Sequence, residues 1–354
     1  MKALVLSGGR GTRLRPFTHT LAKQLVPVGN KPVLFHVLES MGAVGITDIG
    51  IVVGETGNEI RAAVGDGSRF GAAVTYVRQD EPRGLAHAVA AARGFLGEDP
   101  FLLHLGDNFI ENGVARLLDG FERHGGDAEL LLGRVADPRA YGVAERTPLG
   151  RVTRLTEKPS APRSDLAVIG AYAFTAAVHE RIDRLTPSRR GELEITDAVQ
   201  GLVDGGARVW STEVETFWRD TGSVADVLDV NRHLLGRMEA RCAGSVDAES
   251  RLIGRVVVEE GAEVTSSRLV GPLLVGRNSR VAGAFIGPHT SIGEDCAVVD
   301  SGIDHSIVLD RAVVEGAGRI TDSLIGRDSR VTGTGARQGH RVVIGDHSTV
   351  GIPA

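Results

Sequence analysis

The spacing of apolar positions along the chain divides it into two parts with different periods. In the first two-thirds, short apolar runs alternate with stripes of helical spacing. The runs that predict buried strands are Leu4–Leu6, Ile49–Val53, Val74–Val77 and Phe101–Leu105. Strands that alternate with helices are typical of an α/β fold, so we expect a Rossmann-like, mostly parallel sheet with helices on both faces.

The helical stripes are marked by their flanking residues. Apolar positions recur with a period of about 3.6 from Pro32 to Met41, which predicts a helix with Asn30 near its cap. Leu85–Arg93 is alanine-rich and reads as a second helix, and Ile195–Val203 carries a third apolar stripe. Ser223 is placed to cap a last helix, because its hydroxyl can accept from a free N–H of the first turn.

Beyond about residue 240 the helical period disappears, and an aliphatic residue recurs at every sixth position, often followed by glycine. These six-residue steps run from Val258 to Val264, Val275 to Val281, Ile286 through Ile292 to Val298, Ile325 to Val331, and Ile344 to Val350. The pattern resembles the left-handed hexapeptide β-helix, in which each hexad forms one strand and a corner. An ordinary antiparallel β domain is the alternative. We therefore predict two domains, residues 1–240 and residues 241–354, the second a left-handed parallel β-helix.

Composition narrows the class of protein. The 354 residues are 42% hydrophobic and 24% charged, which indicates a globular chain, and a net charge of −5 argues against nucleic acid as a partner. Two cysteines, Cys242 and Cys296, favour a reducing compartment without a disulfide framework. The N-terminus lacks the pattern of a signal peptide, and no apolar stretch is long enough to span a bilayer. We expect a soluble cytoplasmic protein with no membrane partner.

Lysine is rare in this chain, since only four of its 40 basic residues are lysine. They are Lys2, Lys23, Lys31 and Lys158. An ammonium group with rotatable donors is not interchangeable with a planar guanidinium. We interpret Lys23 and Lys158 as positions at which the chemistry requires lysine.

The first apolar run leads into a glycine-rich loop that carries arginine. Gly8, Gly9 and Gly11 allow the backbone to approach an anion and to direct N–H groups toward it, and Arg13 adds a permanently charged fork of donors. The loop therefore predicts a polyphosphate site. It lacks the third glycine of the dinucleotide fingerprint, since Leu14 follows instead, which argues against an oxidoreductase.

Taken together, the blocks Gly8–Arg13, Lys23–Pro27 and Asn30–Pro32 resemble those of the sugar nucleotidyltransferase family, in particular its long-form thymidylyltransferases, which carry a β-helix tail. The resemblance implies that a deoxythymidylyl group passes from dTTP to glucose 1-phosphate with magnesium (Mg²⁺), releasing pyrophosphate. The alternatives are a pyrophosphorylase for UDP-sugars or another nucleotide, a bifunctional enzyme whose β-helix transfers an acyl group, and a non-catalytic regulatory paralogue. A β-helix must cover its ends, so we also expect a homo-oligomer.

The resemblance also implies which residues bind the nucleotide. It places the triphosphate on Gly8, Gly9, Gly11, Thr12, Arg13 and Lys23, the base on Gln79, Pro82 and Gly84, and Mg²⁺ on Asp107 and Asp220. The residues themselves support part of this scheme. Asp107 follows the predicted strand Phe101–Leu105, at the edge where α/β sheets bind ligands. A carboxamide such as that of Gln79 offers a donor and an acceptor to the edge of thymine or uracil.

On the sugar side, the resemblance implies Tyr141, Gly142, Glu157, Lys158, Val168, Gly170, Tyr172 and Arg190, with Lys158 on the sugar phosphate. Adjacent residues of an extended segment point to opposite sides. If Glu157 and Lys158 serve one site, the chain must bend there, and Pro159 is consistent with a bend. We expect His104, which precedes the Asp107 motif on a strand, to be packed rather than catalytic.

Overall fold

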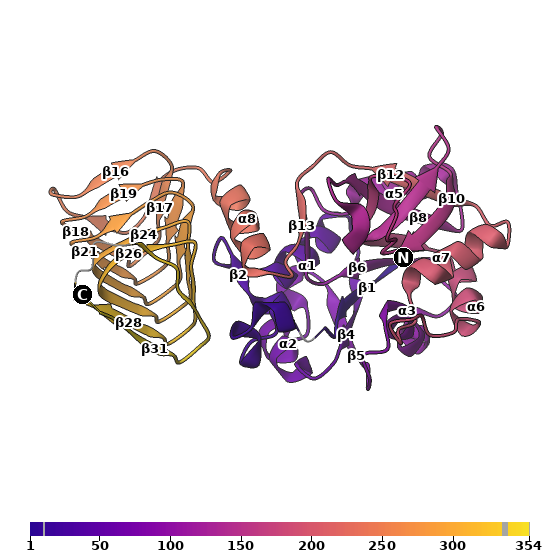
Figure 1. Ribbon diagram of the computed structural model, residues 1–354, viewed down its shortest axis with the longest axis horizontal. Helices are drawn as coiled ribbons and strands as arrows, with labels where there is room; N and C mark the ends of the chain where they lie inside the picture. Colours follow the sequence, from indigo (N-terminus) through magenta and orange to yellow (C-terminus); the bar gives the residue numbers. More distant parts are fainter. Residues whose placement is uncertain (10, 335–338, 354) are drawn as a thin grey trace. The chain divides into compact units, whose positions relative to one another are not determined.

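The computed structural model describes residues 1–9, 11–334 and 339–353 (Figure 1). Contacts group the chain into two compact units. The first consists of Met1–Arg10 and Val33–Asp220, and the second of Gly11–Pro32 and Thr221–Ala354. The division into domains at residue 240 stays a prediction. The compact units differ from it because a segment from the N-terminal part of the sequence packs with the C-terminal part.

The first unit is built on a central sheet whose parallel strands are those predicted from the sequence. Strands β1 (Lys2–Ser7), β4 (Asp48–Val53), β5 (Ala73–Arg78) and β6 (Phe101–Leu105) lie in the order β6-β1-β4-β5. The chain moves in one direction from β1 to β5 and then returns across β1 to β6. The order therefore reverses between β1 and β6, which is the place where open α/β sheets bind ligands.

The other half of this sheet is largely antiparallel, which the apolar runs did not indicate. Strand β11 (Leu166–Phe174) pairs antiparallel with β6, with β8 (Ala128–Arg134) and with β9 (Gly142–Arg146). Strand β10 (Val152–Glu157) extends the sheet beyond β9, and β12 (Val209–Glu213) runs parallel to β8. The sheet is thus Rossmann-like at β1, β4, β5 and β6 and mixed beyond.

The helices of the first unit follow the strands. They are α1 (Val33–Ala43), α2 (Gly57–Val64), α3 (Leu85–Ala91), α4 (Arg93–Leu96), α5 (Ala115–His124), α6 (Ala177–Asp183) and α7 (Ile195–Asp204). Right-handed crossovers place α1 and α2 on one face of the parallel strands and α3 on the other, because the chain reverses direction after β5. Leu4 and Leu6 of β1 pack with Val89 of α3 in one buried cluster.

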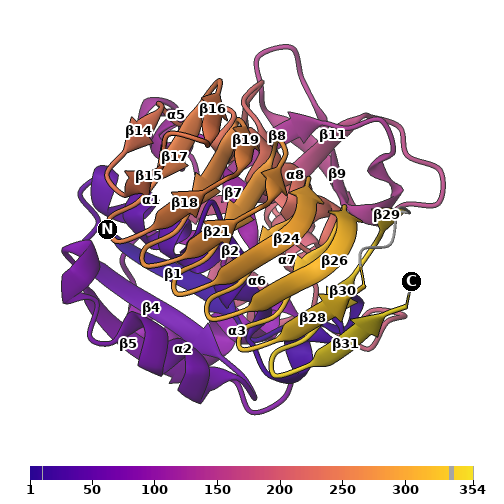
Figure 2. The ribbon, with the colours of Figure 1, turned by 90° about the vertical axis from the view of Figure 1, so that its left-hand side faces the viewer.

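The second unit contains α8 (Val224–Leu235) and a parallel β-helix, as predicted from the six-residue period (Figure 2). Ser223 caps α8, since its hydroxyl accepts from the Asp226 N–H at 3.3 Å. One column of strands comprises β14 (Arg241–Cys242), β17 (Val256–Val258), β20 (Leu273–Val275), β23 (Thr290–Ile292), β25 (Ile307–Val308), β27 (Leu324–Ile325) and β30 (Val343–Ile344).

Two more columns complete the coils. The second comprises β15 (Ser245–Val246), β18 (Glu263–Thr265), β21 (Arg280–Ala282), β28 (Arg330–Gly333), β31 (Thr349–Ile352) and the first halves of β24 (Ala297–Asp304) and β26 (Val313–Thr321). The third comprises β16 (Arg251–Ile253), β19 (Arg268–Val270), β22 (Phe285–Ile286), β29 (Gly339–His340) and the second halves of β24 and β26. Every pairing between these strands is parallel.

The aliphatic residues of the hexads point into the β-helix and form its core, which includes Val258, Val264, Val275 and Val281. Most coils take 17 residues rather than three full hexads, as in the pairing of Leu269 with Ile286. Because a coil of 17 residues is one residue short of three hexads, the six-residue steps do not run continuously along the sequence. Serine hydroxyls bridge successive coils at one of them: Ser306 accepts from the Ser323 N–H, and Ser323 accepts from the Val342 N–H.

The segment 11–32 of the second unit is made of short elements. These are three 3-10 turns, η1 (Thr12–Leu14), η2 (Phe17–His19) and η3 (Lys23–Leu25), and a hairpin of β2 (Pro27–Val28) and β3 (Lys31–Pro32). The prediction that Asn30 lies near a helix cap is wrong. Gly29 and Asn30 have φ values of 56° and 60° and form the tight turn of this hairpin, and α1 begins only at Val33.

The two cysteines lie in different surroundings. Cys296 lies in the core of the β-helix, and burial raises the pKa of its thiol to about 12, so it is a packing residue. Neither Cys296 nor the exposed Cys242 is in a disulfide. In the described part of the chain, no helix is long and apolar enough to cross a membrane.

Candidate functional site

The glycine loop after β1 and the loop after β6 lie side by side at the strand ends of the first unit. The Gly106 N–H donates to the Leu6 carbonyl at 2.9 Å, and a side chain at Gly106 would collide with the Ser7 hydroxyl. Asp107, the next residue in the chain, therefore lies directly beside the loop that carries Gly8 and Gly9. This is the point at which the strand order reverses, so the fold and the motifs indicate the same binding edge.

Asp107 and Asp220 are brought together by a two-stranded ladder. Strand β7 (Asn108–Ile110) pairs antiparallel with β13 (Trp218–Asp220), and Asp220 lies opposite Asn108, one residue from Asp107. Asp107 is buried, with 7% of its surface exposed. Trp218 holds β13 in place, since its ring lies 5.6 Å from that of Tyr141 in an edge-to-face contact.

Gly170 shapes the floor beside these carboxylates. The register of β11 shifts between Val168 and Tyr172, and Gly170 within this bulge has a φ of 79°. A Cβ at Gly170 would lie 2.9 Å from Asn108 Cγ. The Asn108 amide occupies the space that a side chain at position 170 would fill, and it donates to the Ile169 carbonyl at 3.1 Å. Gly170 thus acts on the position of Asn108.

The two carboxylates fit a magnesium ion that arrives with a nucleotide. Mg²⁺ is usually bound by one or two protein carboxylates, with phosphate oxygens and waters completing its octahedron. Among the described residues, no group of three or more histidine, cysteine or acidic side chains is arranged to hold a metal by itself. The donor set of Asp107 and Asp220 therefore suits an ion shared with phosphates.

Gln79, the residue predicted to bind the base, lies against the glycine loop. A Cβ at Gly8 would lie 3.0 Å from Gln79 Oε1. The Gln79 amide nitrogen donates to the Gly84 carbonyl at 3.2 Å and lies 3.0 Å from His87 Nδ1. Because the Gln79 amide hydrogens have partners within the protein, the group that this side chain offers to a base is its acceptor oxygen.

The backbone at position 84 favours glycine for a structural reason. Its φ of 106° favours glycine, and a Cβ would lie 2.8 Å from the Leu193 backbone nitrogen. The Leu193 N–H also donates to the Arg83 carbonyl at 2.7 Å, next to Gly84. The segment that carries Gln79 and Gly84 is thereby joined to the segment that follows Arg190. Pro82 is exposed at the tip of the same loop.

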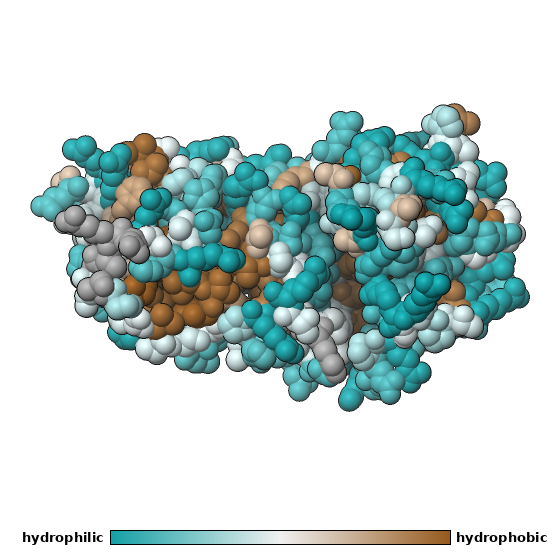
Figure 3. Space-filling view, in the orientation of Figure 1, coloured by the Kyte–Doolittle hydropathy of each residue, from teal (hydrophilic) through white to brown (hydrophobic). Residues whose placement is uncertain are grey.

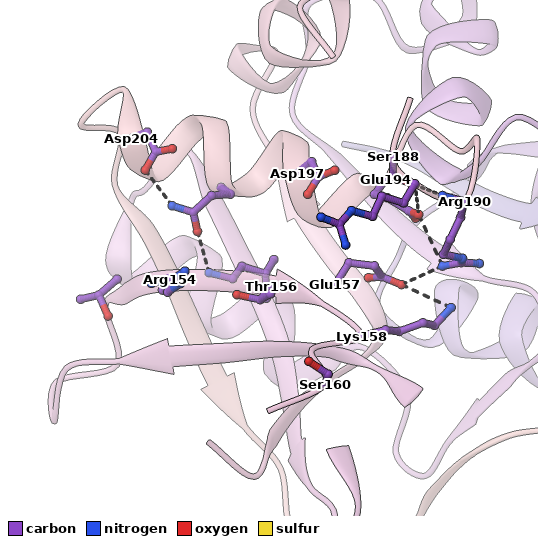
Figure 4. A pocket seen from close by; sticks show the side chains of 14 residues that line it. Arg154, Thr156, Glu157, Lys158, Ser160, Ser188, Arg190, Glu194, Asp197 and Asp204 are labelled. Carbon is purple, nitrogen blue, oxygen red and sulfur yellow. Dashed lines mark hydrogen bonds and ion pairs between the residues drawn. The ribbon is translucent and has the colours of Figure 1, made fainter. Parts of the chain in front are cut away.

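Three of the predicted sugar residues, Glu157, Lys158 and Arg190, border a cavity of about 940 Å³ (Figure 4). Glu157 lies at its centre. Its carboxylate accepts from Thr196 Oγ1 at 3.1 Å and lies 3.3 Å from both Lys158 Nζ and Arg190 Nη1. A Cβ at Gly142 would lie 2.6 Å from Thr196 Cγ2, so only glycine leaves this corner open.

The bend predicted at this position is present and falls on Lys158 itself. Lys158 has a φ of 39°, and its N–H donates to the Tyr141 carbonyl at 2.9 Å. Because of the bend, Glu157 and Lys158 line the same cavity. Arg190 is held by three carboxylates, those of Glu157, Glu192 and Glu194.

Acidic and basic groups both line this cavity. Burial raises the pKa of Glu194, with Glu157 adding to the effect, and burial and the Glu157 charge raise the pKa of Asp197. Lys158 and Arg190 line this cavity together with two further arginines, Arg154 and Arg189, and with the carboxylates of Glu157, Glu194, Asp197 and Asp204. The lining thus offers acceptors to ligand hydroxyls and cations to a phosphate.

Three residues near this site belong to the core. Val168 and Tyr172 lie in the main buried cluster, with Tyr172 stacked on Phe174, and burial raises the pKa of the Tyr172 phenol. Contact of these two side chains with a sugar stays a prediction. His104 is packed, as expected: it is 1% exposed, and burial lowers the pKa of its imidazole to about 4.

The remaining predicted residues lie in segment 11–32 of the second unit. A Cβ at Gly11, whose φ is 61°, would lie 2.9 Å from Lys23 Cβ and 2.8 Å from Thr18 Cγ2. Gly11 and Lys23 are therefore direct neighbours. Thr12 and Arg13 follow on η1 with exposed side chains. Arg10, also in the glycine-rich loop, lies outside the described residues.

Some residues of the site were missed by reasoning from the sequence. Thr196 and Glu194 position the Glu157 and Arg190 side chains, and His87 engages Gln79. A second cavity of about 560 Å³ borders Gln79 and includes Arg61 and Arg78. The signal for Glu194 and Thr196 was available in the stretch 190–197, where polar residues directly precede a helical stripe.

Comparison with known proteins shows the family to which the chain belongs. Residues 2–237 match the nucleotidyl transferase family, and the chain belongs to that family. It is 55% identical over 353 residues to a glucose-1-phosphate thymidylyltransferase from Streptomyces griseus and 51% identical over 354 residues to one from Streptomyces antibioticus, with 99% of each chain covered in both cases. It also resembles a crystal structure assigned as a glucose-1-phosphate thymidylyltransferase from Bacillus anthracis, in complex with sucrose, at 33% identity and a TM-score of 0.62, covering 68% of this chain and 97% of that chain.

Proposed function

We propose that this protein transfers a deoxythymidylyl group from dTTP to glucose 1-phosphate, giving dTDP-glucose and pyrophosphate. The observation that carries the proposal is the β7–β13 ladder, which sets Asp220 opposite Asn108 and next to Asp107 at the reversal point of the sheet. Family membership and the two Streptomyces relatives support the choice of reaction and substrates.

In the proposed reaction, a phosphate oxygen of glucose 1-phosphate attacks the α-phosphorus of dTTP. The bond from the α-phosphorus to the bridging oxygen of the β-phosphate breaks, and that oxygen leaves with pyrophosphate. The protein's task is to position the two substrates and to compensate negative charge. Asp107 and Asp220 would hold Mg²⁺, which would supply charge neutralisation and polarise the phosphoryl group.

The chain's own cations are assigned by substrate. Arg13 and Lys23 hold the triphosphate, with the backbone of Gly8, Gly9, Gly11 and Thr12. Lys158 holds the sugar phosphate, and Glu157 accepts from hexose hydroxyls, since Thr196 and Gly142 keep its carboxylate at the cavity. Arg190 adds charge next to Lys158, although its three carboxylate partners weaken it as a phosphate ligand.

Gln79 supports a base with an N3–H donor. With its amide hydrogens occupied by Gly84 and His87, its oxygen can accept from the N3–H of thymine or uracil, whereas cytosine presents an acceptor there. Gln79 does not sense the thymine methyl group. A uridylyltransferase is therefore the second candidate, and the preference for dTTP rests on the relatives.

The experiment that tests the proposal is pyrophosphate release from glucose 1-phosphate and Mg²⁺, with dTTP, UTP, ATP, GTP and CTP in separate reactions. We expect release with dTTP and its loss when the metal is chelated. Release with UTP alone would keep the reaction and change the base. Absence of release with every nucleotide, repeated with mannose and N-acetylglucosamine 1-phosphates, would contradict the proposal.

A cytoplasmic location and a homo-oligomer are part of the same proposal. Apolar side chains reach the surface of the β-helix unit (Figure 3), among them Leu252, Ile253 and Phe285, which are 37%, 42% and 40% exposed. They lie on the third column of strands. Leu252 and Ile253 are neighbours in sequence, and Phe285 lies two coils further along the same column. Exposed apolar residues of this kind favour association, so we expect assembly in solution, which sedimentation analysis measures.

A further inference from the structure

The segment that carries Arg13 and Lys23 is built into the β-helix unit, and we propose that Asn231 and Asn30 are positioning residues that hold it in place for catalysis. This inference rests on the proposed function, in which Arg13 and Lys23 bind the triphosphate. It assigns to the β-helix a role inside the nucleotidyl transfer reaction. The contacts involved all lie within the second unit.

Asn231 is the centre of the arrangement. It lies on α8, is 0% exposed, and uses its carboxamide in three directions. Its Oδ1 accepts from the Gly29 N–H at 2.8 Å and from the Ser291 hydroxyl at 3.1 Å, and its Nδ2 donates to the His289 carbonyl at 3.2 Å. One buried side chain thus joins the β2–β3 hairpin to the coil that contains β23. A buried polar group of this kind is costly to remove, because its partners lose their hydrogen bonds without gaining water.

Asn30 adds a second, independent bond from the same turn. Its Nδ2 donates to the Ile292 carbonyl of β23 at 2.7 Å. Its φ of 60° is one that asparagine and glycine tolerate, and with Gly29 it forms the turn that suits a two-residue hairpin. Gly29 itself fits closely under α8, since a Cβ there would lie 3.0 Å from Met238 Cε. The hairpin tip is therefore fixed by two amide side chains and by packing.

The other end of the segment contacts a later coil. Thr20 Oγ1 donates to Asp346 Oδ2 at 3.1 Å, and a Cβ at Gly345 would lie 3.0 Å from the Pro16 carbonyl oxygen. Lys23 lies between this contact and the hairpin. Arg13 lies three residues before Pro16, and Gly11 packs on the Lys23 side chain. Both proposed triphosphate ligands are therefore carried by a segment held at two places on the β-helix.

The physical reason for such anchoring is preorganisation. Segment 11–32 consists of single turns and a two-residue ladder, and elements this short are not stable by themselves. A cation stabilises charge on a leaving group only if it is already in position when that charge develops. The β-helix provides the rigid surface that these turns lack, so the loss of an anchor should weaken nucleotide binding before it affects the sugar site.

Two variants and a matched control test the inference in the full-length protein. Asn30→Gly removes the bond to Ile292 while suiting the turn, because glycine accepts the positive φ. Asn231→Ala removes the bond to Gly29 together with those to Ser291 and His289. Ser291→Ala is the control, since it deletes a hydrogen bond to Asn231 and leaves both hairpin bonds in place.

Two readouts are measured for each protein: hydrogen exchange of the backbone amides in residues 11–32, and the KM values for dTTP and glucose 1-phosphate. We expect faster exchange in the segment and a KM for dTTP raised by about tenfold for Asn30→Gly and Asn231→Ala, with a KM for glucose 1-phosphate changed by less than about twofold. Ser291→Ala should leave both the exchange and the KM for dTTP near wild type.

Unchanged exchange of residues 11–32 in both variants would overturn the inference, and so would equal effects on the two KM values. An effect of Ser291→Ala as large as that of Asn30→Gly would show general loosening of the β-helix and would also overturn it. A wild-type protein that turns over no nucleotide is a different result. It contradicts the proposed function, whereas the exchange data still report whether the two asparagines hold the segment.

Discussion

Lys158 and Lys23, two of the four lysines in the chain, are held in place by contacts of very different range. Lys158 is oriented by its own bend, by adjacent Glu157 and by the Tyr141 carbonyl, all within the sugar-side region of the first unit. The segment of Lys23 depends on Asn231, on the Ile292 carbonyl and on Asp346, which are 202, 262 and 326 positions away from their partners. A local motif is sufficient to build the first region, whereas the second needs most of the chain.

Asp107→Asn is expected to have the largest effect, and it acts on neither lysine. The variant keeps the size of the buried side chain but removes a charge from the proposed metal pair, so kcat should fall by a factor of about 10³. Pyrophosphate release at saturating substrates and Mg²⁺ measures it, with the exposed Asp119→Asn as the control. Turnover within a few-fold of wild type would rule out the metal assignment.

Gly170→Ala should have the next largest effect, because it would move Asn108, which lies next to Asp107 in the first unit. The new Cβ would lie 2.9 Å from Asn108 Cγ and would displace the amide that stands opposite Asp220. A displacement of about 1 Å near the reacting groups is expected to lower kcat about 100-fold.

Gly206→Ala is the matched control for Gly170→Ala. Gly206 also has a positive φ, 81°, but no atom lies within 4 Å of an added Cβ. It should lose about 1 kcal/mol of unfolding free energy and retain full kcat. If the two variants behave alike in steady-state assays, backbone strain and not the Asn108 contact explains the result.

A pair of lysine variants addresses the comparison most directly. Lys158→Ala should raise the KM for glucose 1-phosphate by about tenfold and affect the KM for dTTP little, since it removes a cation from the sugar-side cavity. Lys23→Ala should show the opposite pattern. Initial rates measured with each substrate varied in turn give both constants. Equal changes in both constants for either variant would refute the separate assignment of the two lysines.

The smallest effect concerns stability and pH. Burial holds the pKa of His104 at about 4, below its ordinary value of 6.5, so the folded protein keeps this imidazole neutral. Its contribution to stability is complete above pH 6.5 and is lost as the pH falls from 6.5 toward 4, because only the unfolded chain takes up the proton. By pH 5 the loss amounts to about 2 kcal/mol.

His104→Gln should remove this contribution to the pH dependence. Urea unfolding at pH 7.5 and pH 5 measures it, and His19→Gln, at an exposed histidine, is the control. The difference in unfolding free energy between the two pH values should shrink by about 2 kcal/mol in His104→Gln and stay unchanged in His19→Gln. The same shrinkage in both variants would show that His104 is not the titrating group.

The parts of the fold that were predictable are those with a simple period. The parallel strands β1, β4 and β6 are nearly continuous apolar runs because both of their faces are buried, and the hexads of the β-helix repeat an inward-facing aliphatic residue. Strand β5 was also identified, but the expectation that Val74–Val77 is buried is wrong, because β5 lies at the edge of the sheet and none of its residues is buried. The antiparallel strands β8 to β11 were not identified. Strand β11 is buried along its length, but the order of β8 to β11 in the sheet depends on pairings that a single sequence does not reveal.

The candidate site was predictable to the extent that its residues are neighbours in sequence. Glu157 and Lys158 stand next to each other, and only a bend lets both serve one cavity, so the bend followed from geometry. The partners of Glu157 from α7 were not singled out, because side-chain contacts between elements leave no periodic trace. Asn30 was misassigned because asparagine is common both at helix caps and in turns with positive φ, and the sequence alone does not distinguish the two.

The division of the second unit into two stretches of chain has a consequence for protein synthesis. Residues 11–32 are synthesised some 200 to 326 residues before the α8 side chain and the coil residues to which they bind. Contacts between such distant parts of a chain form slowly, and they cannot form before those coils are made. A nascent or truncated chain that has completed the sheet of the first unit therefore still lacks the anchors of segment 11–32.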